Sequence, residues 1–193
     1  YKISVPPDYE AMLQAKEVDR STIKEVNAGF DPRVLTEGRV DVLAVFKSNE
    51  PNVVRNLGFE VNVWDPADFG VPTMGLTYIV RTDFAGSDPD LVTRFLKATL
   101  KAVRYASDNK DEALDIVAKY AEGEDRDHQR FMLETELTDA VSAVTVDRGL
   151  GWMTGDQWEA LYQHLHDFGA LPRPFDYRTA FTDRFLRAAS DGK

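Results

Sequence analysis

In the first third of the chain, the pattern of apolar and polar positions alternates between two kinds of segment. Short runs rich in apolar residues alternate with segments of helical spacing, and Pro, Gly or Asp residues stand at most of the boundaries. Strands are expected over residues 1–5, 23–28, 40–46 and 59–64. Short helices are expected over 9–16, 31–38 and 50–57. This alternation favours a parallel α/β layer.

The pattern changes between residues 65 and 83. Residues 65–75 contain two Pro and two Gly and predict a loop, and one more strand is expected over 76–82. Beyond it the spacing becomes helical, most clearly after Asp88-Pro89, where apolar residues recur every three or four positions. Further helices are expected after Asp108, around 131–137, from Thr154 to Phe168, and around Phe185. We therefore expect a parallel α/β region over 1–75 and a mostly helical region over 76–193.

Charge and composition narrow the function classes. The 193 residues carry 33 acidic and 23 basic side chains, a net charge of −10. Such a field repels phosphate backbones and anionic lipid surfaces, so we expect no nucleic-acid partner and no membrane insertion. The chain has no cysteine, which excludes disulfides, thiolate metal sites and cysteine nucleophiles. No apolar run approaches the length of about 20 residues that spans a bilayer.

Motifs for catalysis and metal binding are absent. The sequence has no nucleophile elbow, phosphate-binding loop, dinucleotide fingerprint or zinc-protease motif. His164 and His166 are two residues apart on an expected helix and face different directions, and His128 lies in a charged run. All three are interpreted as ordinary surface histidines, and no cofactor or metal is expected.

Candidate ligand-binding residues lie where the expected strands end, because open α/β sheets bind ligands beyond the carboxyl ends of their strands. Tyr9, Phe30 and Trp64 stand at or beside such ends, where an aromatic ring can wall a pocket or simply pack in the core. Glu50, with Asn49 beside it, has two readings. Asn49 caps a helix and Glu50 favours its positive end, or the carboxylate and amide face a cleft and bind a polar ring.

Several motifs, taken in order, resemble one family. They are Gly29-Phe30-Asp31-Pro32 with Leu35, Gly38, Val40 and Asp41; Asn49-Glu50-Pro51; Asp68-Phe69-Gly70; Asp88-Pro89-Asp90-Leu91-Val92 with Phe95 and Leu96; Ala113, Asp115, Ile116, Val117 and Tyr120; and Met153 with Trp158. This series is similar to the solute-binding components of ABC transporters. The nearest branch is the one that binds thiamine-pyrimidine precursors, with sulfonate and riboflavin-like binders beside it.

The resemblance implies a class II periplasmic-binding-protein fold, in which two lobes close on a ligand. Residues 1–75 would form most of lobe two, and 76–193 the return to lobe one, with the opening part of lobe one missing. It also implies that the Asn49-Glu50-Pro51 motif supplies a ligand carboxylate. We therefore expect Glu50 and Asn49 to recognise the ligand, and Tyr9, Phe30 and Phe46 to form nearby walls. The implied partner is an ABC permease, and the implied location is periplasmic or extracellular, with a membrane anchor as in lipoproteins.

Two other functions stay open. One is an enzyme of pyrimidine-precursor synthesis with the same fold, although the cysteine-containing motif of that group has no counterpart here. The other is the periplasmic sensor domain of a signalling protein. A lobe without its opening strands exposes apolar surface, so we also expect this chain to oligomerise or to require the missing part.

Overall fold

The computed structural model describes residues 7–121, 123 and 125–190. The expected strand over 1–5 lies outside these ranges. The helices, with η marking a 3₁₀-helix, are α1 (Pro7–Ala15), η1 (Arg20–Thr22), α2 (Arg33–Thr36), α3 (Glu50–Asn56), η2 (Pro66–Phe69), α4 (Thr82–Ser87), α5 (Pro89–Asp108), α6 (Lys110–Ala118), α7 (Arg126–Asp139), α8 (Ala143–Arg148), α9 (Gly155–Asp167), η3 (Tyr177–Thr179) and α10 (Arg184–Ser190).

The expected helices are confirmed where the sequence carries their capping residues. The Asp88 carboxylate accepts a hydrogen bond from the Leu91 amide at 3.1 Å, and Pro89 opens α5. Thr154 and Gln157 form a reciprocal capping box at the start of α9. The first helix was expected to start at residue 9, but α1 already includes Asp8, and the Asp8 carboxylate contacts α9.

The expected strands are not formed in the part of the chain that the structure describes. Residues 23–28, 40–46, 59–64 and 76–81 run as irregular, mostly non-helical backbone, and Thr82 begins α4. A strand needs a second backbone beside it to complete its hydrogen-bond ladder, and no described segment supplies one. The apolar pattern was expected to bury 40–46 on both faces, yet Val42 and Phe46 are exposed. The parallel α/β layer is therefore not seen in these residues.

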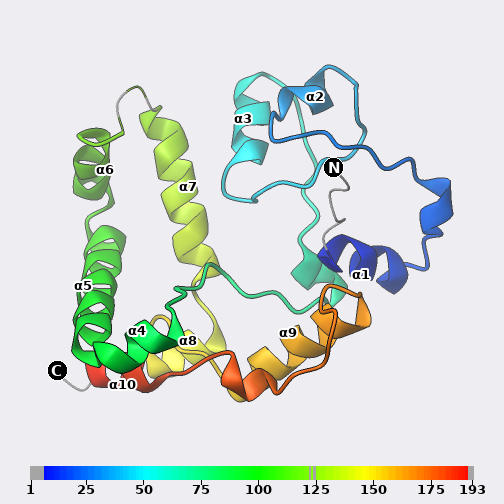
Figure 1. The fold of residues 1–193 in the computed structure, drawn as a ribbon. Helices are drawn as coiled ribbons and strands as arrows, with labels where there is room; N and C mark the ends of the chain where they lie inside the picture. The colour runs from blue at the N-terminus through cyan, green and yellow to red at the C-terminus, as the bar shows by residue number, and fades with distance from the viewer. Residues whose placement is uncertain (1–6, 122, 124, 191–193) are drawn as a thin grey trace.

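The helices pack in a few local pairs (Figure 1). α5 and α6 follow one another along one side, α7 runs beside α6, and α10 lies against α5. α1 packs on η2, α9 packs on η3, and α3 meets α7. The buried apolar residues are Ala11, Val54, Val71, Ala85, Leu114, Phe185, Leu186 and Ala189. They are scattered among these pairs, which makes small separate cores.

Two zones of contact between the described residues before position 76 and those after it stand out. One lies between α3 and α7, and the other between α1 and α9. Among the described helices, none combines the length and the apolar character that crossing a membrane requires.

Candidate functional site

The loop before α3 is closed by Glu50, the first residue of that helix. The Phe46 amide donates a hydrogen bond to Glu50 Oε2 at 2.8 Å, and Asn49 Nδ2 donates to Glu50 Oε1 at 3.3 Å. Glu50 is buried, and its position in the first turn of α3 suits a carboxylate. Asn49 occupies the N-cap position, but its side chain makes no capping bond. Glu50 thus fixes the backbone from which the exposed Phe46 ring projects.

His128 of α7 forms hydrogen bonds to this loop and to α3. Asn52 Nδ2 lies 2.8 Å from His128 Nδ1, and His128 Nε2 lies 2.8 Å from Asn49 Oδ1. The amide nitrogen can only donate and the amide oxygen can only accept, so the neutral ring carries its hydrogen on Nε2. The surface expectation for His128 is wrong, because the residue is buried between α3 and α7.

Two further side chains of the loop also reach α7. Ser48 is buried, and its hydroxyl donates to Glu136 Oε1 at 2.6 Å. Lys47 Nζ lies 2.7 Å from Asp139 Oδ1 and 2.8 Å from Asp65 Oδ2. The Asp139 and Asp65 carboxylates raise the pKa of Lys47, and the bond from Lys47 lowers the pKa of Asp65. The loop is held to one face of α7 by a neutral bond, a charged hydrogen bond and an ion pair.

A hollow of about 430 Å³ opens between α3, η2 and α7. Its lining residues are Lys47, Pro51, Arg55, Val63, Asp65, Asp68, Phe131 and Thr135. Arg55 and Asp68 have no side-chain partner among the described residues, so a donor and an acceptor remain available there. The Phe131 ring supplies an aromatic wall. The Phe131 ring can stack on one face of a flat ring, and Arg55 and Asp68 can hydrogen-bond to polar groups on its edge.

The structure brings together three of the five expected site residues. Phe46, Asn49 and Glu50 share the loop whose neighbours Lys47 and Pro51 line the hollow. Tyr9 lies on α1 and Phe30 in the segment before α2, and neither lines this hollow. Phe30 is 91% exposed.

Sequence reasoning missed the α7 side of the site. His128, Phe131, Thr135, Glu136 and Asp139 all lie there, and their spacing is that of one helical face. The sequence places His128 in a charged run and predicts a helix only around 131–137, whereas α7 starts at Arg126. Helical spacing extended back from Phe131 by three positions was the signal that could have identified His128.

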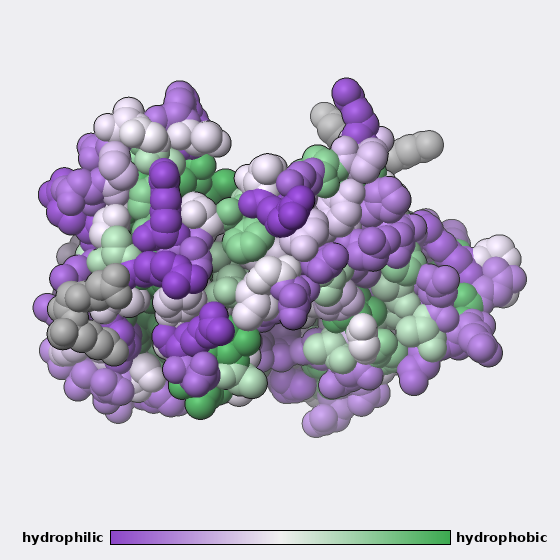
Figure 2. All heavy atoms as spheres, turned by 90° about the horizontal axis from the view of Figure 1, so that it is seen from below, coloured by the Kyte–Doolittle hydropathy of each residue, from purple (hydrophilic) through white to green (hydrophobic). Residues whose placement is uncertain are grey.

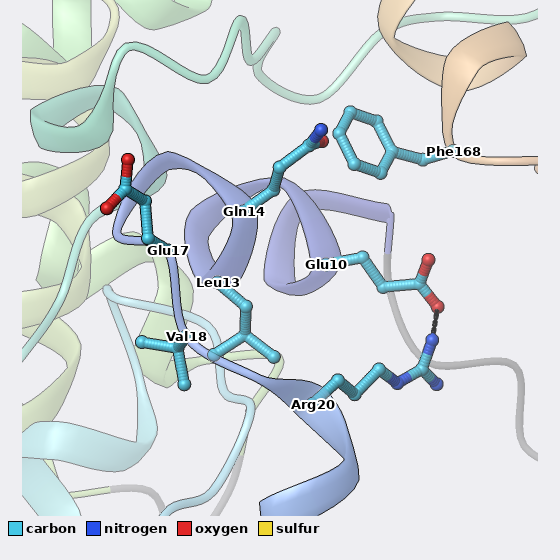
Figure 3. A pocket seen from close by; sticks show the side chains of 7 residues that line it. All are labelled: Glu10, Leu13, Gln14, Glu17, Val18, Arg20 and Phe168. Atoms are coloured by element: carbon cyan, nitrogen blue, oxygen red, sulfur yellow. Dashed lines mark hydrogen bonds and ion pairs between the residues drawn. The ribbon is translucent and has the colours of Figure 1, made fainter.

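A second hollow of about 430 Å³ lies between α1 and the end of α9 (Figure 3). Its lining residues are Glu10, Leu13, Gln14, Glu17, Val18, Arg20 and Phe168. Figure 3 shows the Gln14 amide beside the Phe168 ring, with Glu10 paired to Arg20 below them. Arg20 also binds Glu25, so its cation is already neutralised and holds little attraction for a ligand.

The second hollow is held in place by a buried histidine. His164 Nε2 lies 2.9 Å from Asp8 Oδ1, which fastens α1 to α9. The His164 side chain is only 4% exposed, so the surface interpretation is wrong for this residue as well. His166 is exposed, as expected.

Comparison with known proteins places the chain in a family. The family described as NMT1/THI5 like matches residues 7–113. Riboflavin-binding protein RibY of Chloroflexus aurantiacus is 30% identical over 185 residues, which cover 93% of this chain and 52% of that protein. The formylaminopyrimidine-binding protein of Halalkalibacterium halodurans is 22% identical over 185 residues, covering 91% of this chain and 54% of that protein. The chain thus spans about half the length of these curated relatives. With the family model matching more than half of its residues, the chain belongs to the NMT1/THI5-like family.

Proposed function

We propose that the chain is part of a solute-binding protein that holds a small pyrimidine-containing heterocycle in the hollow between α3, η2 and α7. The observation that carries the proposal is the pairing of the Phe131 ring with the unpartnered side chains of Arg55 and Asp68. The volume of about 430 Å³ falls within the range of roughly 300–1,000 Å³ typical of small-molecule sites.

The relatives support the same ligand class. One is named for binding riboflavin and the other for binding a formylaminopyrimidine, and both ligands contain a pyrimidine-type ring with donors and acceptors on its edge. Asp68 can accept a hydrogen bond from a ring N–H or an amine, and Arg55 can donate to a carbonyl oxygen. Both relatives are named as binding proteins, which favours binding over catalysis.

The expected site residues take different parts in this proposal. We propose that Phe46 adds an aromatic surface to the site, and that Glu50 and Asn49, which hold the loop, also contact the ligand. Tyr9 and Phe30 would join the site when the two lobes close. The two-lobe α/β architecture, with 1–75 and 76–193 in different lobes, is part of the proposal, as are an ABC permease as partner and an extracytoplasmic, membrane-anchored location.

Calorimetric titration with riboflavin and with a formylaminopyrimidine tests the proposal. The full-length protein should be used, because the chain spans half the length of its relatives. We expect Phe131→Ala to weaken binding roughly two- to tenfold, as loss of a stacked ring pair removes about 0.5–1.5 kcal/mol.

Phe168→Ala is the matched control, because it removes the same ring from the second hollow. If Phe168→Ala weakens binding and Phe131→Ala does not, the site lies in the second hollow. Glu50→Gln separates the two readings of that residue. Unchanged affinity would mean that Glu50 serves the loop alone and does not contact the ligand.

A further inference from the structure

Four side chains and one backbone amide form a hydrogen-bond chain with a single direction. Asn52 donates to His128, His128 donates to Asn49, and Asn49 donates to Glu50. Glu50 also accepts from the Phe46 amide, so all donation ends at its carboxylate. Each link uses a group that can act only as donor or only as acceptor, except His128. The imidazole changes its hydrogen-bonding role when it is protonated, because both of its nitrogens then become donors.

We infer that His128 is a positioning residue for the ligand site and that its protonation weakens ligand binding at acidic pH. The inference rests on the proposed binding function. A protonated ring carries hydrogen on both nitrogens, so Nδ1 turns an N–H toward the Asn52 amide, which also presents N–H groups. The bond to α3 then breaks or the amide must turn over. A broken bond loosens the contact of α7 with the helix that contributes Pro51 and Arg55 to the hollow.

The surroundings of His128 do not replace the lost bond. Of the elements packed against α7, α3 carries Glu50, which already accepts two hydrogen bonds, and Arg55, which is itself a cation. The charged groups of α6 and their partners on α7 are Lys110 with Glu134, Asp111 with Arg126 and Arg130, and Asp115 with Arg126. Asp125 and Asp127 stand at the start of α7 itself, where the Asp125 carboxylate caps the helix. Both ring nitrogens of His128 are bonded to amide side chains and neither to a carboxylate, so the added charge sits in a buried position without a bound counter-ion, which is unfavourable.

Riboflavin titrations at about pH 7.5 and about pH 5.5 test the inference on the full-length protein. For the native sequence we expect affinity to fall roughly five- to tenfold at the lower pH, the size of effect that follows from one broken hydrogen bond. His128→Gln retains one donor and one acceptor but cannot titrate. We expect it to lose the pH dependence, whatever its affinity at neutral pH.

His164→Gln is the matched control, since it alters the other buried histidine, at the α1–α9 contact. We expect it to leave the pH dependence of riboflavin affinity unchanged. Affinity that stays constant between the two pH values in the native protein would overturn the inference. So would a pH dependence that persists in His128→Gln.

A ligand-free measurement keeps this inference separate from the proposed function. Nitrogen NMR of the imidazole should show hydrogen on Nε2 of His128 at neutral pH, with loss of that signature and movement of the Asn52 side-chain amide signal on acidification. If riboflavin and the formylaminopyrimidine both fail to bind while these signals change together, the binding proposal fails and the His128 switch stands. If Nδ1 carries the hydrogen at neutral pH, the switch itself is wrong.

Discussion

Glu17 is the non-glycine residue with a left-handed backbone among those that the structure describes, at φ 54°. It follows α1, where the Val18 amide donates to the Leu13 carbonyl at 2.9 Å and the chain reverses direction. Helices commonly end in this way, but with glycine at the left-handed position, because a Cβ there costs about 1 kcal/mol. Glu17 therefore stores a small amount of strain at the edge of the second hollow.

Glu17→Gly should raise the free energy of unfolding. Removing the Cβ relieves about 1 kcal/mol, and the greater freedom of glycine in the unfolded chain returns part of it, which leaves a gain of about 0.5 kcal/mol. Urea denaturation followed by circular dichroism measures the change. Glu17→Val is the matched comparison and should destabilise, because a β-branched residue tolerates this backbone poorly. A lower unfolding free energy for Glu17→Gly would contradict the strain.

At the scale of elements, Lys47 joins the loop before α3 to both η2 and α7. Its ammonium binds Asp65, which caps η2, and Asp139, the last residue of α7. The lowered pKa of Asp65 means that its share of the stabilisation is present above the unfolded-state pKa and is lost as pH falls through the folded one. The raised pKa of Lys47 means that its share is present below its unfolded-state pKa and lost only in strong alkali. The stabilisation linked to Asp65 and that linked to Lys47 are both present at neutral pH. The stabilisation linked to Asp65 disappears below about pH 4.

Lys47→Met should lower the unfolding free energy by less than about 1 kcal/mol at neutral pH, since the ion pairs are partly exposed. The difference between native and variant proteins should shrink toward pH 3, because the lowered pKa of Asp65 lets its carboxylate lose its charge only in that acidic range. Urea denaturation at the two pH values measures it. Arg39→Met, which removes only a local surface pair with Glu37, is the control and should show no comparable effect.

The helices and the strands differ in how far the sequence could predict them. The starts of α5 and α9 follow from Asp88, Pro89 and Thr154, whose effects act within four residues. A strand depends on a partner backbone that can lie anywhere in the chain, so the apolar run at 40–46 predicts a tendency and not a ladder. The site divides in the same way. The Asn49–Glu50 loop is a local motif, whereas its contact with His128 joins residues 79 positions apart.

The whole molecule exposes more surface than a compact protein of its size. The accessible area is 14000 Å², while a compact 21.8 kDa protein exposes about 9,300 Å². Large apolar side chains contribute to the excess, with Leu76 90% and Ile79 95% exposed. Figure 2 shows hydrophobic side chains reaching the surface in several places on the face seen there. Much of this apolar surface lies in the segments with strand-like sequence, which indicates that they are suited to pairing with further backbone.

We predict that this chain on its own self-associates with increasing concentration, and more strongly at high salt, where the net charge of −10 is screened. Light scattering after size-exclusion chromatography measures the association. The double variant Leu76→Lys with Ile79→Lys should reduce it without lowering the unfolding free energy, because both side chains already face solvent.

A matched double variant at polar exposed positions, Thr73→Lys with Thr77→Lys, controls for the added charge. Reduction of association by the control pair to the same extent would assign the effect to charge alone. Association that neither pair changes would place the contact on another surface.

The extended segment between η2 and α4 is a favourable site for proteolytic cleavage of the chain. Residues 72–80 form no helix and no backbone ladder, so a protease can accommodate them readily, and chymotrypsin should cut after Tyr78 before it cuts the helices. The contacts of Asn49 and Ser48 with α7, and of Asp8 with α9, cross that cut. The two pieces should therefore elute together after nicking, and two separately produced halves should reassemble when mixed. Separation of the nicked pieces in native buffer would show that the peptide chain, and not these contacts, holds the halves together.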